Sequence, residues 1–217
     1  VLIVFLFIIL VIFYMSIFGV KTDKFNKKII NNILKFNKKI NLNLNDVTYL
    51  LNPYDFTVNI KTKNPLILFE GKKLKIKDIQ TNISLKSLIN DQFSIDDLQI
   101  TTKEIKLNDI VALIRTFQNS PQLFVLNTII KDGLVTAGIN LNFDEMGKVK
   151  ENYKISGTVK KVRLSFLNQL KLQNLNFSFD IEKNIYSLKQ IDMKLNNIKI
   201  TSPLIEIEKK KNSFFVN

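Results

Sequence analysis

The pattern of apolar and polar positions divides the chain into three segments. Residues 1–20, "VLIVFLFIILVIFYMSIFGV", are apolar throughout and carry no charge. As a helix they would extend roughly 30 Å, the thickness of the hydrocarbon core of a bilayer. The run is too long for a cleavable signal peptide and has no small-residue cleavage site before Lys21. We therefore predict a transmembrane helix that is retained as a signal anchor.

Residues 21–40 have a helical period. Lysines occupy the positions between an apolar stripe, and this stripe consists of Phe25, Ile29, Ile33, Phe36 and Ile40. We predict a short amphipathic helix here. It would either lie on anionic headgroups or cover the end of the sheet that follows. The second interpretation is favoured because the next residues enter a strand pattern at once.

From residue 41 to 217 the period is two, which is typical of half-buried strands. Strands are predicted at 42–47, 55–61, 73–79, 93–100, 104–110, 138–143, 153–160, 170–181 and 193–200. A single helix is predicted over 108–117, capped by Asn108 or Asp109. Since no crossover helices separate the strands, an antiparallel sheet is favoured. The stretch "GLVTAG" at 133–138 lacks the Lys and Ser/Thr of a P-loop, so its glycines are interpreted as a turn before a strand.

The alternation slips by one residue at an Asp or Asn in six places, where composition would give about one. A β-bulge would explain such a slip, because an inserted residue returns the apolar side chains to one face. The alternative is a turn that ends the strand, and it is favoured at Asp109. The six segments are 42–47, 74–79, 93–98, 105–110, 170–175 and 193–198.

The predicted fold is mainly β, with a curved, bulged, mostly antiparallel sheet over 41–217 after the two helices. Such a sheet has one apolar face and too few helices to cover it. It would close on itself as a sandwich or barrel, or it would stay open as a groove for an apolar ligand.

Composition excludes several functions. The net charge of +13 comes almost entirely from scattered lysines, with no aromatic-basic motif, which argues against nucleic acid as a partner. The absence of Cys and His removes thiol nucleophiles, Ser-His triads and the usual metal ligands. The carboxylate pairs Asp96–Asp97 and Glu206/Glu208 would suit a hydrolase. Adjacent acids such as Asp96 and Asp97 point to opposite faces of a strand, however, and Glu206 and Glu208 share the face opposite Ile205 and Ile207, which suggests exposure to solvent. No enzyme activity and no cofactor are predicted.

The apolar run followed by "GKKLKIKDI", "ISLKSLI" and "FSIDDLQI" resembles the amino-terminal region of the AsmA family of bacterial inner-membrane proteins. The first residue is Val and the last residues are "SFFVN", so we expect a piece of a longer protein. The resemblance implies a single-pass protein whose β-groove lies in the periplasm and carries phospholipid or supports outer-membrane assembly. Lysines after residue 20 oppose this topology unless the preceding residues are more basic.

The family offers no catalytic residues, and its functional element is the groove lining. A trough of this kind would spare acyl chains a barrier of roughly 0.8 kcal/mol per methylene. The rival interpretation is an anchored, closed sandwich that binds envelope proteins. The candidate lining residues are Phe56, Val58, Ile60, Leu74, Ile76, Phe93, Ile95, Ile139, Leu141, Phe143, Ile155, Leu170, Leu172, Phe177, Phe179, Met193 and Leu195.

Overall fold

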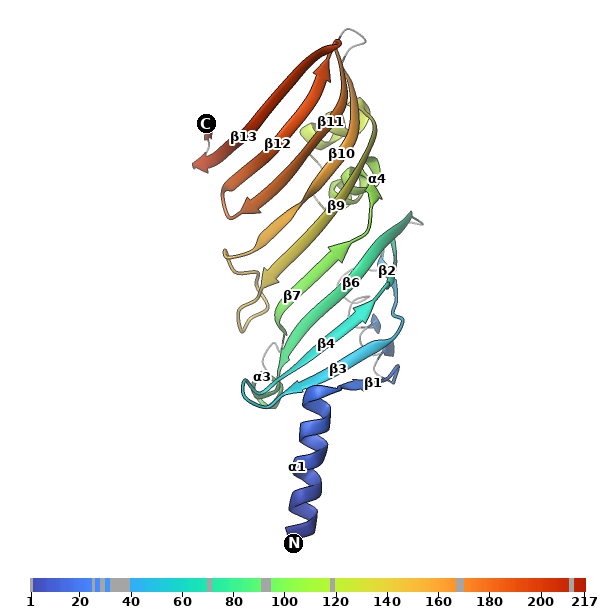
Figure 1. The fold of residues 1–217 in the computed structure, drawn as a ribbon, viewed down its shortest axis with the longest axis vertical. Coiled ribbons are helices and arrows are strands. Elements are labelled where there is room, and N and C mark those ends of the chain that lie inside the picture. The colour runs from blue at the N-terminus through green and yellow to red at the C-terminus, as the bar shows by residue number, and fades with distance from the viewer. Residues whose placement is uncertain are drawn as a thin grey trace. The chain divides into compact units, whose positions relative to one another are not determined.

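The structure is a computed structural model, and it describes residues 2–24, 26–27, 30–31, 40–69, 72–90, 95–117, 120–166, 170–210 and 213–217. The chain, whose helices and strands are labelled in Figure 1, divides into two compact units. Unit 1 comprises residues 1–101 and 140–153, and unit 2 comprises residues 102–139 and 154–217. The described strands of both units pair antiparallel in open sheets, which confirms the mainly β, antiparallel prediction.

Helix α1 (Leu2–Ile17) is shorter than predicted and is followed at once by strand β1 (Val20–Lys21). The helix ends because Gly19 adopts a left-handed conformation with φ of 68°. A side chain there would meet the Tyr49 carbonyl oxygen at 2.8 Å. Within the described ranges, no helix combines the length and the apolar character needed to cross a membrane. The transmembrane span predicted over residues 1–20 is therefore not supported.

The segment predicted as an amphipathic helix over 21–40 falls mostly outside the described residues. Its apolar positions Phe25, Ile29, Ile33 and Phe36 are among those not described. Where the chain is described, Asn26, Lys27, Ile30 and Asn31 are helical, whereas Ile40 begins strand β2. The helix boundary predicted at residue 40 is therefore wrong.

In unit 1, five strands form a ribbon that is three strands wide, because two of its three rows each consist of two shorter strands. The third row is β6, and β7 (Ile95–Thr102) lies beside it. Val47 pairs with Thr62, and Asn43 pairs with Leu66. The stretch between Asn43 and Val47 is as long as the stretch between Thr62 and Leu66, so β2 continues the register of β3. β5 continues the register of β4 in the same way, against one long partner, β6. The bounds are β2 (Ile40–Asn43), β3 (Val47–Asn52), β4 (Thr57–Lys63), β5 (Leu66–Phe69) and β6 (Lys72–Ser84).

The slip at Asp78 has a different cause from the one predicted. No residue is inserted there, because Lys63–Asp78 and Leu66–Lys75 keep one register. Instead the neighbouring strand is interrupted at Asn64, where φ is 49°. The Asn64 N–H donates to the Lys77 carbonyl at 2.7 Å, and the Asn45 side chain donates to the Asn64 carbonyl at 3.0 Å.

The face of β6 that carries apolar residues changes at this row, and beyond it the residues of both faces are half-buried. Leu74 and Ile76, on one face, are buried before it. After it, Ile79 and Ile83, on the other face, are half-buried. The bulge predicted at residues 74–79 is wrong, but the slip does mark a change in the ribbon.

In unit 2, the strands follow one another in chain order from β8 to β14. Neighbouring strands are joined by antiparallel ladders that run along most of their length, as in β10–β11 and β12–β13. The bounds are β8 (Ile105–Lys106), β9 (Ile130–Asn142), β10 (Lys154–Phe166), β11 (Leu170–Glu182), β12 (Ile185–Leu195), β13 (Ile198–Lys210) and β14 (Ser213–Val216).

Three successive strands of unit 2 carry bulges. β10 gains a residue at Lys161, β11 gains one at Asn174, and β12 gains one at Gln190; their φ angles are 54°, 52° and 54°. The bulge predicted in 170–175 is thus confirmed. Those at Lys161 and Gln190 were not predicted, because they contain neither Asp nor Asn.

The slips predicted at 42–47, 105–110 and 193–198 are not bulges, and the first residues of the slip at 93–98 lie outside the described residues. Asp46 lies in the connection between β2 and β3, and Asp109 lies in the first turn of a helix. Asn196 and Asn197, with φ of 45° and 73°, form the two-residue turn between β12 and β13. At Asp97, a side-chain oxygen accepts a hydrogen bond from the Asn82 N–H at 2.8 Å. In a regular ladder, a backbone carbonyl of the neighbouring strand would accept such a bond.

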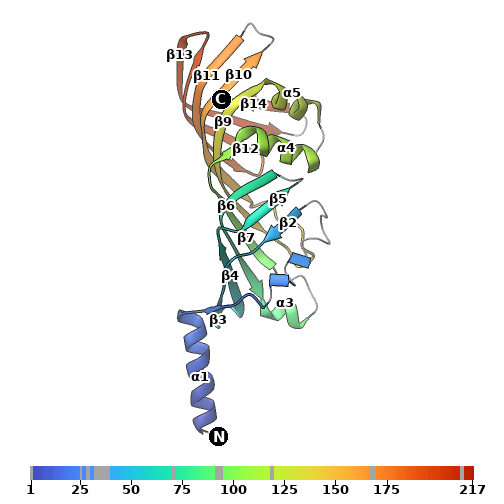
Figure 2. The same ribbon diagram turned by 90° about the vertical axis from the view of Figure 1, so that its right-hand side faces the viewer.

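Helices α4 (Leu107–Phe117) and α5 (Pro121–Ile129) lie on one side of the strands of unit 2 (Figure 2). α4 confirms the helix predicted over 108–117. α5 and the short α3 (Leu85–Ile89) of unit 1 were not predicted. The glycines at 133 and 138 lie inside β9 and not in a turn.

Candidate functional site

The apolar face of unit 2 is built by residues that pair across four strands. Gly157 pairs with Phe179, Phe179 with Leu188, and Leu188 with Ile205. Paired residues share a face, so each row carries apolar side chains from strand to strand. We call this set the apolar face of unit 2: Ile155, Gly157, Val159, Val162, Leu164, Leu172, Leu175, Phe177, Phe179, Ile181, Tyr186, Leu188, Ile191, Met193, Leu195, Ile205 and Ile207.

The bulges keep this face continuous. Val159 and Val162 are three positions apart, so regular alternation would place them on opposite faces. The residue inserted at Lys161 returns Val162 to the side of Val159, and both are buried, with 5% and 1% of their surface exposed. Gln190 does the same for Ile191, which is 6% exposed.

The opposite face of these strands is polar. Asp180 and Lys189 form an ion pair at 2.8 Å, and Thr136 and Thr158 share a hydrogen bond at 2.8 Å. Polar groups on this side are thus paired with one another, and the apolar face is left to nonpolar contacts.

Only part of the apolar face is covered within unit 2. A side chain at Gly133 would meet Val162 Cγ2 at 2.9 Å and the Leu107 Cβ at 3.5 Å, so α4 begins where the sheet is densely packed. α5 contacts β10 in the same region. By contrast, Phe177, Phe179, Ile181, Leu188, Ile205 and Ile207 remain half-buried.

Phe177 and Phe179 dominate the open part. Their ring centroids lie 6.4 Å apart at an interplanar angle of 58°. The Phe179 ring lies against Gly157, where a Cβ would come within 2.8 Å of the ring. Glycine at this position therefore gives the ring its place on the sheet.

The predicted lining residues fall into four groups. Leu74 and Ile76 are buried, with 6% and 5% of their surface exposed. Phe56 lies in the β3–β4 turn with φ of 51° and 66% exposure, and Leu170 is 48% exposed. Phe93 lies outside the described residues. The others are half-buried on strands or just after one: Val58, Ile60, Ile95, Leu141 and Phe143 in unit 1, and Ile139, Ile155, Leu172, Phe177, Phe179, Met193 and Leu195 in unit 2.

The predicted lining left out many residues of this face, among them Tyr186, Leu188, Ile181, Ile205 and Ile207 and the buried Val159, Val162 and Ile191. A signal for the first two was present, because "IYSLKQIDMKL" alternates, slips at Gln190 and alternates again. The search for slips at Asp and Asn passed over it.

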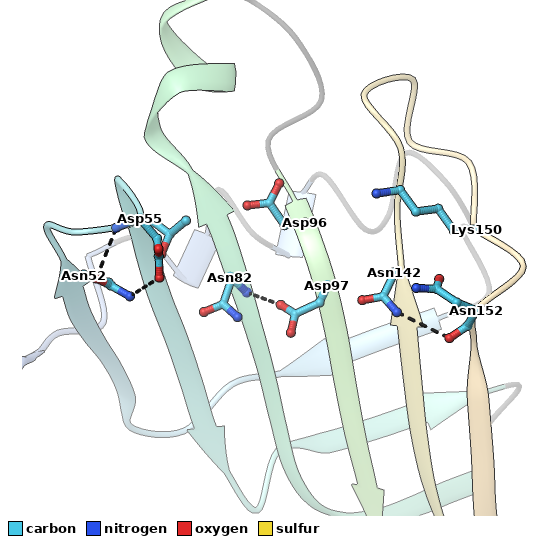
Figure 3. Close-up of a pocket in the computed structure, with 9 residues that line it drawn as sticks. Asn52, Asp55, Asn82, Asp96, Asp97, Asn142, Lys150 and Asn152 are labelled. Carbon is cyan, nitrogen blue, oxygen red and sulfur yellow. Dashed lines mark hydrogen bonds between the residues drawn. The ribbon is translucent and has the colours of Figure 1, made fainter.

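A polar pocket of about 390 Å³ lies in unit 1 (Figure 3). Both Asp96 and Asp97 line it, although adjacent residues of a regular strand would face opposite ways. Asp97 departs from that rule because its carboxylate bonds the Asn82 N–H. The other lining residues are Asn52, Asp55, Thr57, Asn82, Asn142, Lys150 and Asn152.

The chemistry of this pocket is limited. Partial burial raises the pKa of Asp96, the neighbouring Asp97 carboxylate raises it further, and Lys150 lowers it. Asp97 is held by a backbone N–H, and Asp55 accepts from the Asn52 amide at 2.7 Å. Among the residues that the structure describes, no group of three or more Asp or Glu side chains is placed to hold a metal ion.

The second carboxylate pair lies on β13. Glu206 pairs with Ser187 and Glu208 with Ile185, so both face away from Ile205 and Ile207 as predicted. The Glu208 carboxylate forms an ion pair with Lys210 at 2.9 Å.

No family model, no curated protein and no solved structure matches the chain. The resemblance to the AsmA family therefore stays a prediction.

Proposed function

We propose that the protein handles lipid, with the apolar face of unit 2 binding the acyl chains of phospholipids. The observation that carries this proposal is the half-buried part of that face. It is lined by Phe177, Phe179, Ile181, Leu188, Ile205 and Ile207, which follow one another across β11, β12 and β13.

The chemistry of the surface suits an acyl chain. Moving the methylenes of a sixteen-carbon chain from a bilayer into water costs more than about 10 kcal/mol of free energy. A surface that is apolar along several strands offsets this cost. It offers no specific polar contact, so it would distinguish lipids by their chains more than by their headgroups.

Helix α1 supports a membrane location for the protein. None of its residues is buried, and Leu2, Phe5, Phe7 and Phe13 are each more than 60% exposed. Transfer of such side chains from water into lipid gains about 1.5–3 kcal/mol each. In our proposal α1 therefore contacts lipid and attaches the protein to a membrane, which by the resemblance would be the bacterial inner membrane with the sheets in the periplasm.

The alternative, a closed sandwich that binds envelope proteins, requires a second layer of strands. In the described part of unit 2, the layer over the sheet consists of helices α4 and α5. We therefore favour the open face.

Photo-crosslinking tests the proposal on the full chain in membranes that contain labelled phospholipid. A benzophenone amino acid replaces Phe179 in one variant and Ser178 in the other. The two positions are adjacent on β11 but face opposite sides, and α1 is present in both. We expect acyl-chain adducts at position 179 and few at position 178. Equal capture at both positions, or capture at neither, would overturn the proposal.

A further inference from the structure

Helix α5 presents apolar side chains to solvent. Phe124, Val125 and Leu126 are 58%, 54% and 37% exposed, and Ile114 of α4 is 42% exposed. The side of α5 turned toward the rest of unit 2 carries Leu123, Asn127 and Ile129, which are half-buried. We call Ile114, Phe124, Val125 and Leu126 the α5 patch. Its residues do not belong to the apolar face of unit 2.

The charges within the segment that carries the α5 patch are all positive. Residues 110–131 contain Arg115 and Lys131 and no Asp or Glu; Asp109 and Asp132 flank this segment, and the Asp132 carboxylate forms an ion pair with Arg163 at 3.0 Å. The Arg115 guanidinium lies 5.2 Å from the centre of the Phe124 ring, and the Lys131 ammonium donates to the Thr128 carbonyl at 3.0 Å. One cation thus lies beside the patch and the other lies just after the end of the helix.

The helix itself is well defined. The Ser120 hydroxyl accepts the Leu123 N–H at 3.3 Å, and Pro121 occupies the first turn. These features hold three consecutive apolar side chains at fixed positions on the surface.

We propose that the α5 patch docks onto the surface of an anionic lipid bilayer. Exposed apolar side chains flanked by cations are what an interfacial helix presents to acidic headgroups. A second copy of the chain is a poorer occupant, because it would bring a second Arg115 and Lys131 toward the first pair, and the adjacent Asp132 carboxylate is already paired with Arg163. This docking is separate from the binding of acyl chains proposed above and does not depend on it.

The chain contains no tryptophan, so a single substitution gives an unambiguous fluorescent reporter. The full-length Phe124→Trp variant is reconstituted in vesicles of phosphatidylcholine alone or mixed with phosphatidylglycerol. The acyl chains are brominated near the headgroup so that they quench nearby indoles. Ile185→Trp is the matched control, because Ile185 is also in unit 2, is 44% exposed and pairs with Glu182 and Glu208 on the neighbouring strands.

We expect the Phe124→Trp variant to show a blue shift and quenching in anionic vesicles and weak quenching in neutral ones. The Ile185→Trp variant should show no such response. Arg115→Gln and Lys131→Gln should each lower the ratio of docked to free patch by about fivefold. Absence of quenching at position 124, equal quenching of both reporters, or independence from lipid charge would overturn the proposal. A blue shift without quenching that grows with protein concentration would assign the patch to a second copy instead.

Discussion

The backbone N–H of Lys161 donates to the side-chain oxygen of Asn176 at 2.9 Å, and this bond joins the bulge of β10 to strand β11. The Asn176 amide in turn donates to the carbonyl of Asn174, at the bulge of β11, at 2.8 Å. One side chain thus links two bulges on neighbouring strands.

Replacement of Asn176 by Ala should lower the free energy of unfolding by about 1 kcal/mol, because the Lys161 N–H loses its acceptor. Urea unfolding followed by circular dichroism measures the change. Gln173→Ala on the same strand is the control and should stay within about 0.5 kcal/mol. Equal effects of the two substitutions would mean that the bond contributes nothing.

The stability of variants at position 190 should depend on how easily the new residue adopts the left-handed backbone conformation of Gln190, whose φ is 54°. Gly adopts this conformation without strain, whereas a β-branched residue does not. We expect Gln190→Gly to be the more stable of two variants, by about 1–2 kcal/mol over Gln190→Val. Thermal unfolding of both variants decides the order. The opposite order would show that side-chain packing outweighs the backbone at this bulge.

Gly157→Ala should destabilise unit 2 strongly. The new methyl group would meet the Phe179 ring and the Thr136 carbonyl oxygen, and overpacking of this kind typically costs about 1–3 kcal/mol. Gly138→Ala is the control, because its Cβ would meet Ser156 at an ordinary 3.8 Å. The double variant Gly157→Ala with Phe179→Leu should recover part of the loss in chemical denaturation. Similar stability of the two single variants would contradict the packing described for Phe179.

Ile76 and Phe177 should differ although both were predicted to line the groove. Ile76 is 5% exposed, so Ile76→Asp buries an unpaired carboxylate and should abolish the β-type circular dichroism. Phe177 is half-buried, and Phe177→Asp should keep that signal. A loss of the signal in both variants would mean that Phe177 belongs to a closed core, which would also remove the basis for acyl-chain binding.

The Asp96 carboxyl should titrate above its ordinary pKa, and the two groups beside it should move that pKa in opposite directions. Asp97→Asn keeps the acceptor for the Asn82 N–H but removes a negative charge, so the pKa of Asp96 should fall. Lys150→Gln removes the compensating cation, so the pKa should rise. Carboxyl carbon shifts in an NMR titration report both changes, and an unmoved pKa in both variants would exclude the charge coupling.

The raised pKa of Asp96 also sets the sign of a pH effect on stability. The folded state holds this proton more tightly than the unfolded state, in which the pKa is about 3.9. The contribution of Asp96 to stability is therefore present at low pH and is lost as the pH rises from the unfolded pKa through the folded one. Asp97→Asn should reduce this loss when unfolding is followed from acidic to neutral pH.

The period of the sequence was sufficient to predict an antiparallel β protein and the helix at 108–117. It was also sufficient to locate the bulge at Asn174, because a slip combined with Asn points to a left-handed residue. The slip at Asp78 was misread because its cause lies on another strand. Asn64 interrupts that strand, and the sequence around Asp78 does not reveal which strand is its neighbour.

Only some residues of the half-buried part of the apolar face could be predicted from the sequence. Alternation singled out Phe177 and Phe179, but the residues opposite them, such as Leu188 and Ile205, depend on register, which a single strand does not encode. The burial of Leu74 and Ile76 depends on cover from elsewhere in the fold. Helix α5 was missed because "LFVL" has no helical stripe; Leu123 is half-buried, whereas Phe124, Val125 and Leu126 are exposed.

The bulges of unit 2 cancel along two ladders, β10–β11 and β11–β12. The extra residue at Lys161 is balanced by the one at Asn174, so the β10–β11 pairing that begins with Lys154–Glu182 returns to the same alignment at Leu164–Leu172. The β11–β12 pairing recovers in the same way across Asn174 and Gln190. In each of these strand pairs, the residue pairing after the bulges therefore has the same register as the pairing before them. Duplication or loss of a whole hairpin would therefore leave neighbouring hairpins undisturbed, and evolution could change the length of such a sheet in steps of two strands.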